Sequence, residues 1–258
     1  MRRFALLIAL VAIATAEPRL TRVSAQTRTL TVAAASDLQA ALPEMIKGFE
    51  REAKATVTVS FGSSGNFFAQ IQNGAPYDVY LSADIDYPKR LVASGHADAS
   101  SLYQYATGRI VLWTRKDSGV DISTGLRSLA DARVTRVAIA NPKYAPYGRA
   151  AEAALRYERI YDAVRGKLVL GENISQATQF ATSGAADGGI VAQSLALVPA
   201  VARLGDFALI PADWHQPLRQ RMVLLKDPPA AIRAFYDYLS TPEAQQIMVR
   251  YGFAMPRD

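Results

Sequence analysis

The chain has 258 residues, of which half are apolar and 9% are aromatic, and it contains no cysteine. This length allows one large domain or two medium-sized domains with hydrophobic cores. The absence of cysteine excludes a disulfide scaffold, a thiolate metal site and a cysteine nucleophile. The formal net charge is +6. Because Lys and Arg form no cluster interleaved with aromatic residues, the sequence gives little support to nucleic-acid binding.

The first residues have the pattern of a secretory signal peptide. A pair of arginines is followed at residues 4–16 by an apolar run that is too short to span a bilayer as a stable helix. Small-residue cleavage patterns end at Ala16 and at Ala25, and we favour Ala25 because the first predicted strand follows it closely. Neither pattern is followed by cysteine, so we expect a cleaved, exported protein without a lipid anchor. Removing residues 1–25 lowers the formal net charge from +6 to +3.

The next part of the chain alternates between strand-like and helix-like segments. Strands are predicted at residues 29–35, 56–61 and 75–83, and helices at residues 38–50, 66–74 and 84–92. Alternation at this spacing predicts a parallel sheet covered by helices. Ser36 and Asp37 precede the first helix and are suitable N-cap residues for it.

The chain from residue 109 onward predicts a second unit of the same kind. Strands are predicted at residues 109–114, 136–140, 167–171, 187–192 and 221–226, and helices at residues 149–157, 175–182 and 194–203. We expect the strand at 221–226 to lie beside the strand at 109–114. Two helices, at residues 230–239 and 242–251, follow a Pro-Pro break and are expected to return to the first unit.

Four of the predicted strands end in a turn-rich stretch that opens a helix. The clearest case contains Ser63 and Ser64 between two glycines. Such a junction leaves backbone N–H groups unpaired, with the positive end of the helix dipole behind them. Small residues let an anion come close to these donors. The other junctions lie at Ser36, Tyr147 and Ile174, and their repetition predicts an anion site.

The sequence offers little for catalysis. The two histidines, His96 and His215, are far apart and show no metal-ligand spacing. An exported hydrolase with Ser63 or Ser64 as nucleophile would need one of them as a base, and no Gly-x-Ser-x-Gly pattern is present. We therefore expect no enzyme activity and no direct side-chain metal ligands. A structural or adhesive module is a further alternative, which predicts no ligand-dependent rise in melting temperature.

Six motifs stand in a characteristic order along the chain: Ala33–Leu38, Phe61–Gly65, Gly74–Asp84, Asn141–Gly148, Ala234–Leu239 and Tyr251–Phe253. In this order they resemble the periplasmic molybdate-binding proteins of ABC-type importers, over nearly all of the mature chain. The resemblance implies a two-lobed α/β fold, the type II periplasmic binding protein. Each lobe would be a mostly parallel sheet flanked by helices, with the ligand in the interlobe cleft. Residues 26–107 and 227–258 would form lobe 1, and residues 108–226 lobe 2.

The resemblance also implies how the oxyanion is held, namely by serine hydroxyls and backbone amides at helix starts, without a charged donor. Motif positions assign Ser36 and Ser64 as hydroxyl donors, and Tyr147 and Ile174 as backbone donors. Asp37 is expected to donate its amide to the anion or to cap the helix.

The chain departs from the pattern at Ala192, where the best-known members have a tyrosine whose hydroxyl binds the anion. Tyr147, Tyr144 and Asn173 are candidates to supply the missing contact.

The predicted donors suit a fully ionised tetrahedral anion, which carries only acceptors. Neutral dipoles avoid the desolvation cost of a buried Arg or Lys. Together with these donors, the resemblance implies a monomeric periplasmic protein that needs no cofactor and delivers molybdate, and also tungstate, to the permease of an ABC importer. The alternative is a sulfate- or phosphate-binding protein of the same fold. Phosphate keeps a proton near neutral pH, and Asp37 would then be its acceptor.

Overall fold

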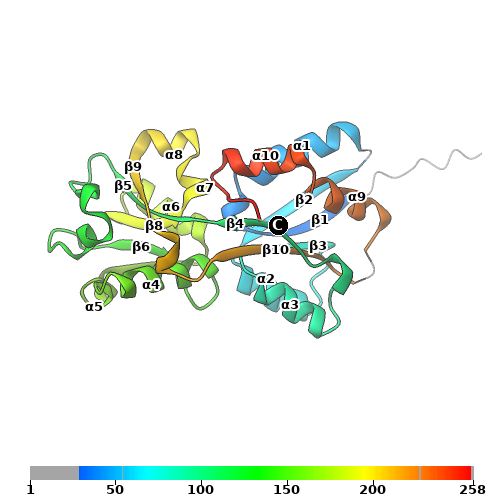
Figure 1. The fold of residues 1–258 in the computed structure, drawn as a ribbon, viewed down its shortest axis with the longest axis horizontal. Helices are drawn as coiled ribbons and strands as arrows, with labels where there is room; N and C mark the ends of the chain where they lie inside the picture. The colour runs from blue at the N-terminus through cyan, green and yellow to red at the C-terminus, as the bar shows by residue number, and fades with distance from the viewer. Residues whose placement is uncertain (1–28, 54, 227, 257–258) are drawn as a thin grey trace, which may run out of the picture.

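A computed structural model describes residues 29–256, except residues 54 and 227. Its strands form two five-stranded sheets, each in a lobe of its own, and the two lobes lie side by side along the long axis of the molecule (Figure 1). This is the two-lobed α/β fold that the sequence predicts. The predicted signal peptide, residues 1–25, lies outside the described residues.

The first lobe contains the N-terminal sheet. Its strand order is β2 (Thr56–Gly62), β1 (Thr29–Ala35), β3 (Val79–Ser82), β10 (Leu218–Leu224) and β4 (Tyr103–Gly108). Only β10 runs against the other strands, so the sheet is mostly parallel in direction. The helices on one side are α1 (Ala41–Glu52), α9 (Ala230–Tyr238) and α10 (Pro242–Arg250). Those on the other side are α2 (Ser64–Gln72) and α3 (Asp86–Ala93) (Figure 1). Two short 3₁₀ helices, η1 (Ser36–Leu38) and η2 (Ala99–Ser101), complete the lobe.

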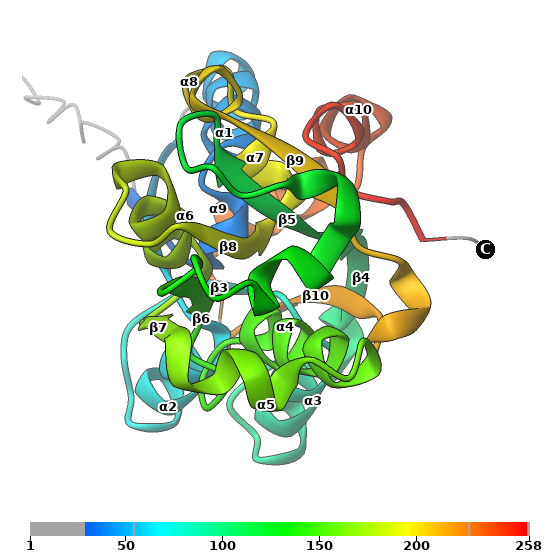
Figure 2. The same ribbon diagram turned by 90° about the vertical axis from the view of Figure 1, so that its left-hand side faces the viewer.

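The second lobe repeats this plan. Its strand order is β7 (Leu168–Gly171), β6 (Val137–Ala140), β8 (Gly188–Ala192), β5 (Ile110–Arg115) and β9 (Gly205–Leu209), and only β5 is antiparallel to its neighbours. One helical layer holds α4 (Pro146–Tyr157) and α5 (Tyr161–Val164), and the other holds α6 (Ile174–Ser183), α7 (Gln193–Ala196) and α8 (Pro199–Leu204) (Figure 2). The 3₁₀ helices are η3 (Ile122–Ala130), η4 (Arg165–Lys167) and η5 (Ala212–Trp214).

The last strand lies elsewhere than the sequence predicts. Residues 221–226 were expected beside 109–114, and this is wrong, because β10 lies between β3 and β4 with Met222 opposite Leu81. The chain therefore returns to the first sheet between β9 and β10, before Leu218, and not near Lys226. Its outward crossing, from β4 into β5, lies near the predicted position.

The first helix also begins later than predicted. Ser36 and Asp37 belong to η1, and α1 begins only at Ala41. Neither side chain caps a helix, so the predicted capping role is wrong. Both side chains are buried and are therefore available for contacts inside the molecule.

The two C-terminal helices pack on the first lobe, as predicted. The fully buried ring of Phe235 in α9 meets Phe49 of α1 edge-on, with 5.1 Å between the ring centroids. Burying a side chain of this size contributes roughly 1.5–3 kcal/mol, so this contact helps to hold α9 on α1.

Tryptophans occur only in the second lobe among the described residues. Trp113 on β5 is fully buried in the core, and its ring lies against Gly205 of β9. Trp214 in η5 stacks on Tyr157 of α4, with 5.1 Å between the ring centroids. Both indoles are therefore held by neighbours from their own lobe.

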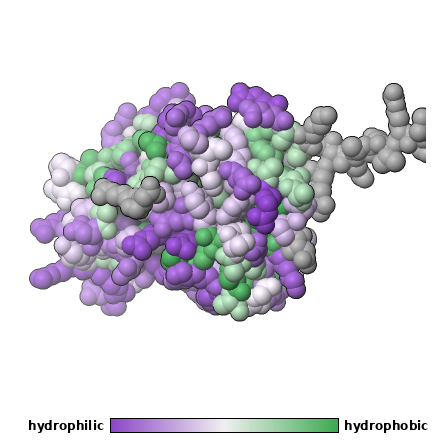
Figure 3. All heavy atoms as spheres, turned by 45° about the vertical axis from the view of Figure 1, so that its right-hand side comes forward, coloured by the Kyte–Doolittle hydropathy of each residue, from purple (hydrophilic) through white to green (hydrophobic). Residues whose placement is uncertain are grey.

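None of the helices within the described ranges is both long and apolar enough to cross a membrane. On the face that Figure 3 shows, hydrophobic residues form small patches separated by hydrophilic ones. The large apolar side chains that are exposed belong to separate elements: Tyr157, Leu170, Leu204, Leu209 and Val249. Single exposures of this kind are normal for a folded protein.

Candidate functional site

Four strand-to-helix junctions meet in one small pocket between the lobes. Its lining residues are Ala35, Ser36, Asp37, Gly62, Ser63, Ser64, Ala83, Ala145, Pro146, Tyr147 and Ile174. The four junctions lie at the ends of β1, β2, β6 and β7, and Ala83 adds the end of β3; ligands of open α/β sheets bind at such carboxyl ends of strands. The structure thus brings together five of the predicted site residues, namely Ser36, Asp37, Ser64, Tyr147 and Ile174.

The pocket accepts only a compact guest. The cavity volume is about 10 Å³, which is roughly enough for one water-sized sphere. None of the lining residues is Lys, Arg or His. The pocket therefore offers hydroxyl, amide and carboxyl groups to a guest of a few atoms, and it has no room for a sugar or a peptide.

Both lobes contribute to the pocket, and polar contacts join them beside it. The Gly65 amide of α2 donates to the carbonyl of Tyr144 at 2.8 Å. The Ser175 amide of α6 donates to Oγ of Ser36 at 3.3 Å. At the rim, Nη2 of Arg149 lies 2.6 Å from Oδ2 of Asp84. The lobes are therefore closed around the pocket.

The junction before α2 supplies two hydroxyl groups. Oγ of Ser64 accepts the Ala83 amide at 3.0 Å, which leaves the hydroxyl hydrogen available for another acceptor. Ser63 is 3% exposed, and its Oγ has no partner among the described residues. Leaving a buried hydroxyl unpaired costs about 1–3 kcal/mol, so an acceptor inside the pocket would relieve that cost. Ser63 is not among the predicted ligand residues, although its hydroxyl beside that of Ser64 was a signal for this role.

The junctions before α4 and α6 supply backbone donors. Tyr147 and Ile174 lie in the first turn of these helices, where N–H groups have no intrahelical acceptor. Within the described residues, no hydrogen bond uses either amide. A glycine lets α4 approach this closely, because a Cβ on Gly148 would lie 2.1 Å from the carbonyl oxygen of Ala140 at the end of β6.

The other two candidates, Asn173 and Tyr144, do not line the pocket. The side chain of Asn173 caps α6 by accepting the amide of Gln176 at 3.0 Å. Tyr144 takes part through its carbonyl, which holds the two lobes together. Ala192 is buried at the end of β8 and also lies outside the lining, so this position adds no polar side chain to the pocket.

Asp37 is the one acidic residue that lines the pocket, and it is fully buried. Its Oδ2 accepts the hydroxyl of Tyr147 at 2.9 Å and also Nε2 of Gln220. Its Oδ1 has no partner among the described residues. Burial raises the pKa of Asp37 from 3.8 to about 6, although the hydrogen bonds from Gln220 and Tyr147 act in the opposite direction. Gln220 was not predicted, because nothing in its neighbourhood in the sequence indicates that β10 passes beside η1.

Neither histidine lies at the pocket. His96 contacts Ser94, with 2.9 Å between Nδ1 and Oγ, and Nδ1 of His215 is 2.8 Å from the carbonyl of Gln216. Ser63 therefore has no histidine base within reach, and the same holds for Ser64. The described part of the chain contains no group of three His, Cys, Asp or Glu side chains that could hold a metal ion.

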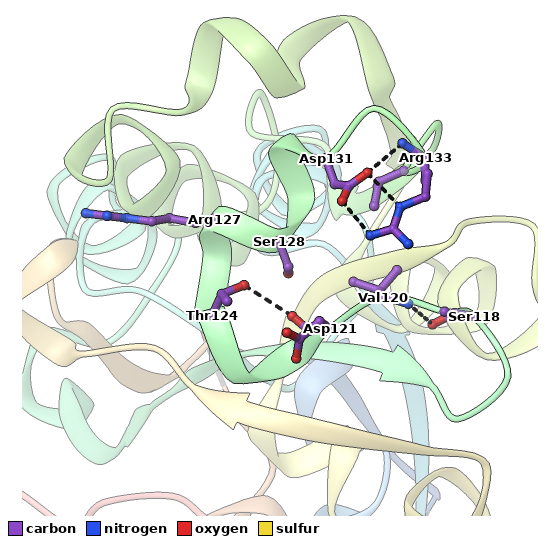
Figure 4. Close-up of a pocket in the computed structure, with 10 residues that line it drawn as sticks. Ser118, Val120, Asp121, Thr124, Arg127, Ser128, Asp131 and Arg133 are labelled. Carbon is purple, nitrogen blue, oxygen red and sulfur yellow. Dashed lines mark hydrogen bonds and ion pairs between the residues drawn. The ribbon is translucent and has the colours of Figure 1, made fainter.

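A larger hollow lies in the second lobe around η3, away from the junctions (Figure 4). Two of its charged groups form an ion pair, with 2.7 Å between Nη2 of Arg133 and Oδ2 of Asp131, and Arg127 pairs with Glu158 outside the hollow. The Thr124 hydroxyl donates to the backbone carbonyl of Asp121 at 3.3 Å. None of the predicted site residues lines this hollow.

Known proteins resemble this chain over most of its length. Residues 30–254 match the family described as bacterial extracellular solute-binding protein. The molybdate-binding protein ModA of Azotobacter vinelandii is 38% identical over 235 residues, which cover 90% of this chain and 92% of that protein. The protein of the same name from Rhodobacter capsulatus is 40% identical over 207 residues, 80% of each chain. The solved periplasmic molybdate-binding protein of A. vinelandii matches with a TM-score of 0.82 and 33% identity, covering 88% of this chain and 100% of that one.

Proposed function

This chain belongs to the bacterial extracellular solute-binding protein family, and we propose that it binds molybdate and delivers it to an ABC-type importer. The observation that carries the proposal is the small pocket, where hydroxyl and amide donors from four helix starts converge and no cationic side chain is present. The molybdate-binding relatives, at 38% and 40% identity, support this choice of ligand.

The donors suffice for useful affinity. The hydroxyls of Ser36, Ser63 and Ser64 and the amides of Tyr147 and Ile174 are the proposed ligands. A hydrogen bond to a charged group contributes about 1.5–3 kcal/mol, and micromolar affinity needs about 8 kcal/mol. Five such bonds exceed that value when each contributes about 2 kcal/mol or more, and the upper part of the range leaves energy for the ordering of the lobes. Tungstate has the same charge and shape, so we expect the same pocket to bind it.

The proposed transport cycle uses closure of the two lobes. With β10 in the first sheet, residues 29–108 and 218–256 would move as one body and residues 109–217 as the other. The closed, loaded monomer would meet the permease in the periplasm. This role requires neither catalysis nor a cofactor, since the anion is released unchanged.

A second candidate function is phosphate binding by the same pocket. The observation that favours it is the unpartnered Oδ1 of Asp37, which as an ionised oxygen could accept the proton of hydrogen phosphate. In that case Asp37→Asn would abolish phosphate binding.

Sodium molybdate is expected to raise the melting temperature by roughly 5–10 °C when its concentration is 100 times the dissociation constant. Saturation of this kind adds about 2.7 kcal/mol to the free energy of unfolding, and each kcal/mol corresponds to about 2–4 °C for a chain of this size. Scanning calorimetry with molybdate, tungstate, sulfate and phosphate at equal concentration ranks the four anions by the rise in melting temperature that each one causes. A larger shift with sulfate or phosphate would contradict the proposed ligand, and no shift with any of the four would contradict a binding function.

A further inference from the structure

The two oxygens of the Asp37 carboxyl group differ in their surroundings. Oδ2 accepts hydrogen bonds from Tyr147 and Gln220, whereas Oδ1 has no partner among the described residues, although the side chain is fully buried and lines the pocket. A proton on Oδ1 turns this oxygen into a donor. We propose that Asp37 is a neutral carboxylic acid in the anion-bound protein and that its Oδ1–H donates to the oxyanion, so that binding takes up one proton from solution.

Electrostatics favour the neutral acid. This inference rests on the proposed function, in which the guest of the pocket is a dianion. An ionised Asp37 would place a further negative charge beside it, and like charges in one buried site favour the protonated form of a carboxyl group. Burial already raises the pKa of Asp37 to about 6 without an anion. The anion raises this pKa further, so the proton stays bound at neutral pH.

Among the described residues, no cationic side chain bonds to Asp37 to oppose this, and Arg149 of α4 pairs with Asp84 instead. Two titratable groups act on it, Tyr147 from α4 and Tyr105 from β4, and burial holds the pKa of both phenols well above the usual value. The remaining polar neighbours are uncharged: Ser36 in η1, Ser63 and Ser64 before and in α2, Ser194 in α7, and Gln220 in β10. Among the described residues, no Lys, Arg or His donates a hydrogen bond to Asp37. The carboxyl group therefore has two ways to be stable in the closed pocket, protonation or a guest that donates to it.

Calorimetric titration distinguishes a protonated Asp37 from an ionised Asp37 that accepts a hydrogen bond from the guest. Sodium molybdate is titrated into the full-length protein at about pH 7.5 in buffers of different ionisation enthalpy, which gives the number of protons taken up per anion. The expected value is close to one. By linkage, the dissociation constant should then rise about tenfold per pH unit between about pH 7 and 8. Asp37→Asn should bind without proton uptake and without this pH dependence, because its amide presents an N–H that does not titrate.

A matched control removes one carboxylate from the distant hollow of Figure 4. Asp131→Asn should keep both the proton uptake and the pH dependence of the wild type. Proton uptake near zero while molybdate binds would overturn the inference and leave the proposed function standing, whether or not Asp37→Asn folds. Phosphate binding that Asp37→Asn abolishes would overturn the inference too, since Asp37 would then be an ionised acceptor. Failure to bind molybdate at any pH between about 6 and 8 would contradict the proposed function itself.

Discussion

Replacing Gly65 with alanine is expected to weaken molybdate binding by about 5- to 150-fold while leaving the ligand-free protein at least as stable as the wild type. A Cβ at this position would lie 2.7 Å from the carbonyl oxygen of Tyr144 and 3.0 Å from its Cα. Tyr144 belongs to the opposite lobe, so this collision arises only when the lobes close. Overpacking of this kind costs about 1–3 kcal/mol, which is the stated loss of affinity. Within α2 itself, alanine is the better helix former by about 1 kcal/mol.

Two measurements test this result. Calorimetry gives the affinity for molybdate, and a melting curve without ligand gives the stability. Gly166→Ala is the control, because a Cβ there meets no atom within 4 Å, and it should keep the affinity of the wild type. Wild-type affinity in Gly65→Ala would show that binding does not require this contact between the lobes. A lower melting temperature of the free variant would instead place the collision inside the first lobe, where the hydroxyl of Tyr87 also lies 2.7 Å from the added carbon.

The two serines before α2 are expected to differ when each is replaced by alanine. Both changes should lower the affinity for molybdate by about 10- to 150-fold, since each removes a hydrogen bond worth about 1.5–3 kcal/mol to a charged guest. Ser63→Ala should leave the free protein at least as stable as the wild type, because its Oγ has no partner to lose and its unpaired burial is itself a cost. Ser64→Ala should also lower the free energy of unfolding by about 1–3 kcal/mol, because the buried amide of Ala83 loses its acceptor.

Binding titrations and melting curves of the free variants separate these effects. Ser183→Ala, at an exposed serine, should change neither quantity. If Ser63→Ala binds molybdate as tightly as the wild type, Ser63 is not a ligand and its buried hydroxyl needs another explanation. Equal stability of the two free variants would contradict the structural role of Ser64.

The strand-to-helix junctions could be predicted from the sequence because each one is a local pattern of neighbouring residues. The helix that follows Ile174 shows this clearly. Its end at Gly184 was predicted from residue type, and Gly184 indeed has a left-handed backbone with φ of 79°. Asn173 precedes this helix and is a strong N-cap by type, although the resemblance made it a candidate ligand. A strand, a turn and a helix start within a few residues can thus be recognised without any knowledge of the rest of the chain.

The surroundings of Asp37 could not be predicted in this way. Its partners are 110 residues away at Tyr147 and 183 residues away at Gln220. Gln220 reaches it because β10 joins the first sheet, and an apolar strand pattern does not say which strands will be its neighbours. Because strand pairing could not be read from the sequence, the predicted neighbour of residues 221–226 was also wrong. Contacts between lobes are set by the whole fold, and the chemistry of the pocket depends on them.

The location of both tryptophans has a practical consequence for optical assays. Trp113 lies against Gly205 and Trp214 against Tyr157, both in the same lobe, so a rigid closure should leave intrinsic indole fluorescence nearly constant when the anion binds. An attached dye is the better reporter, and the chain contains no native thiol that would compete for it. A single cysteine at exposed Asp86, on the rim where the lobes meet, would place such a dye where its surroundings change.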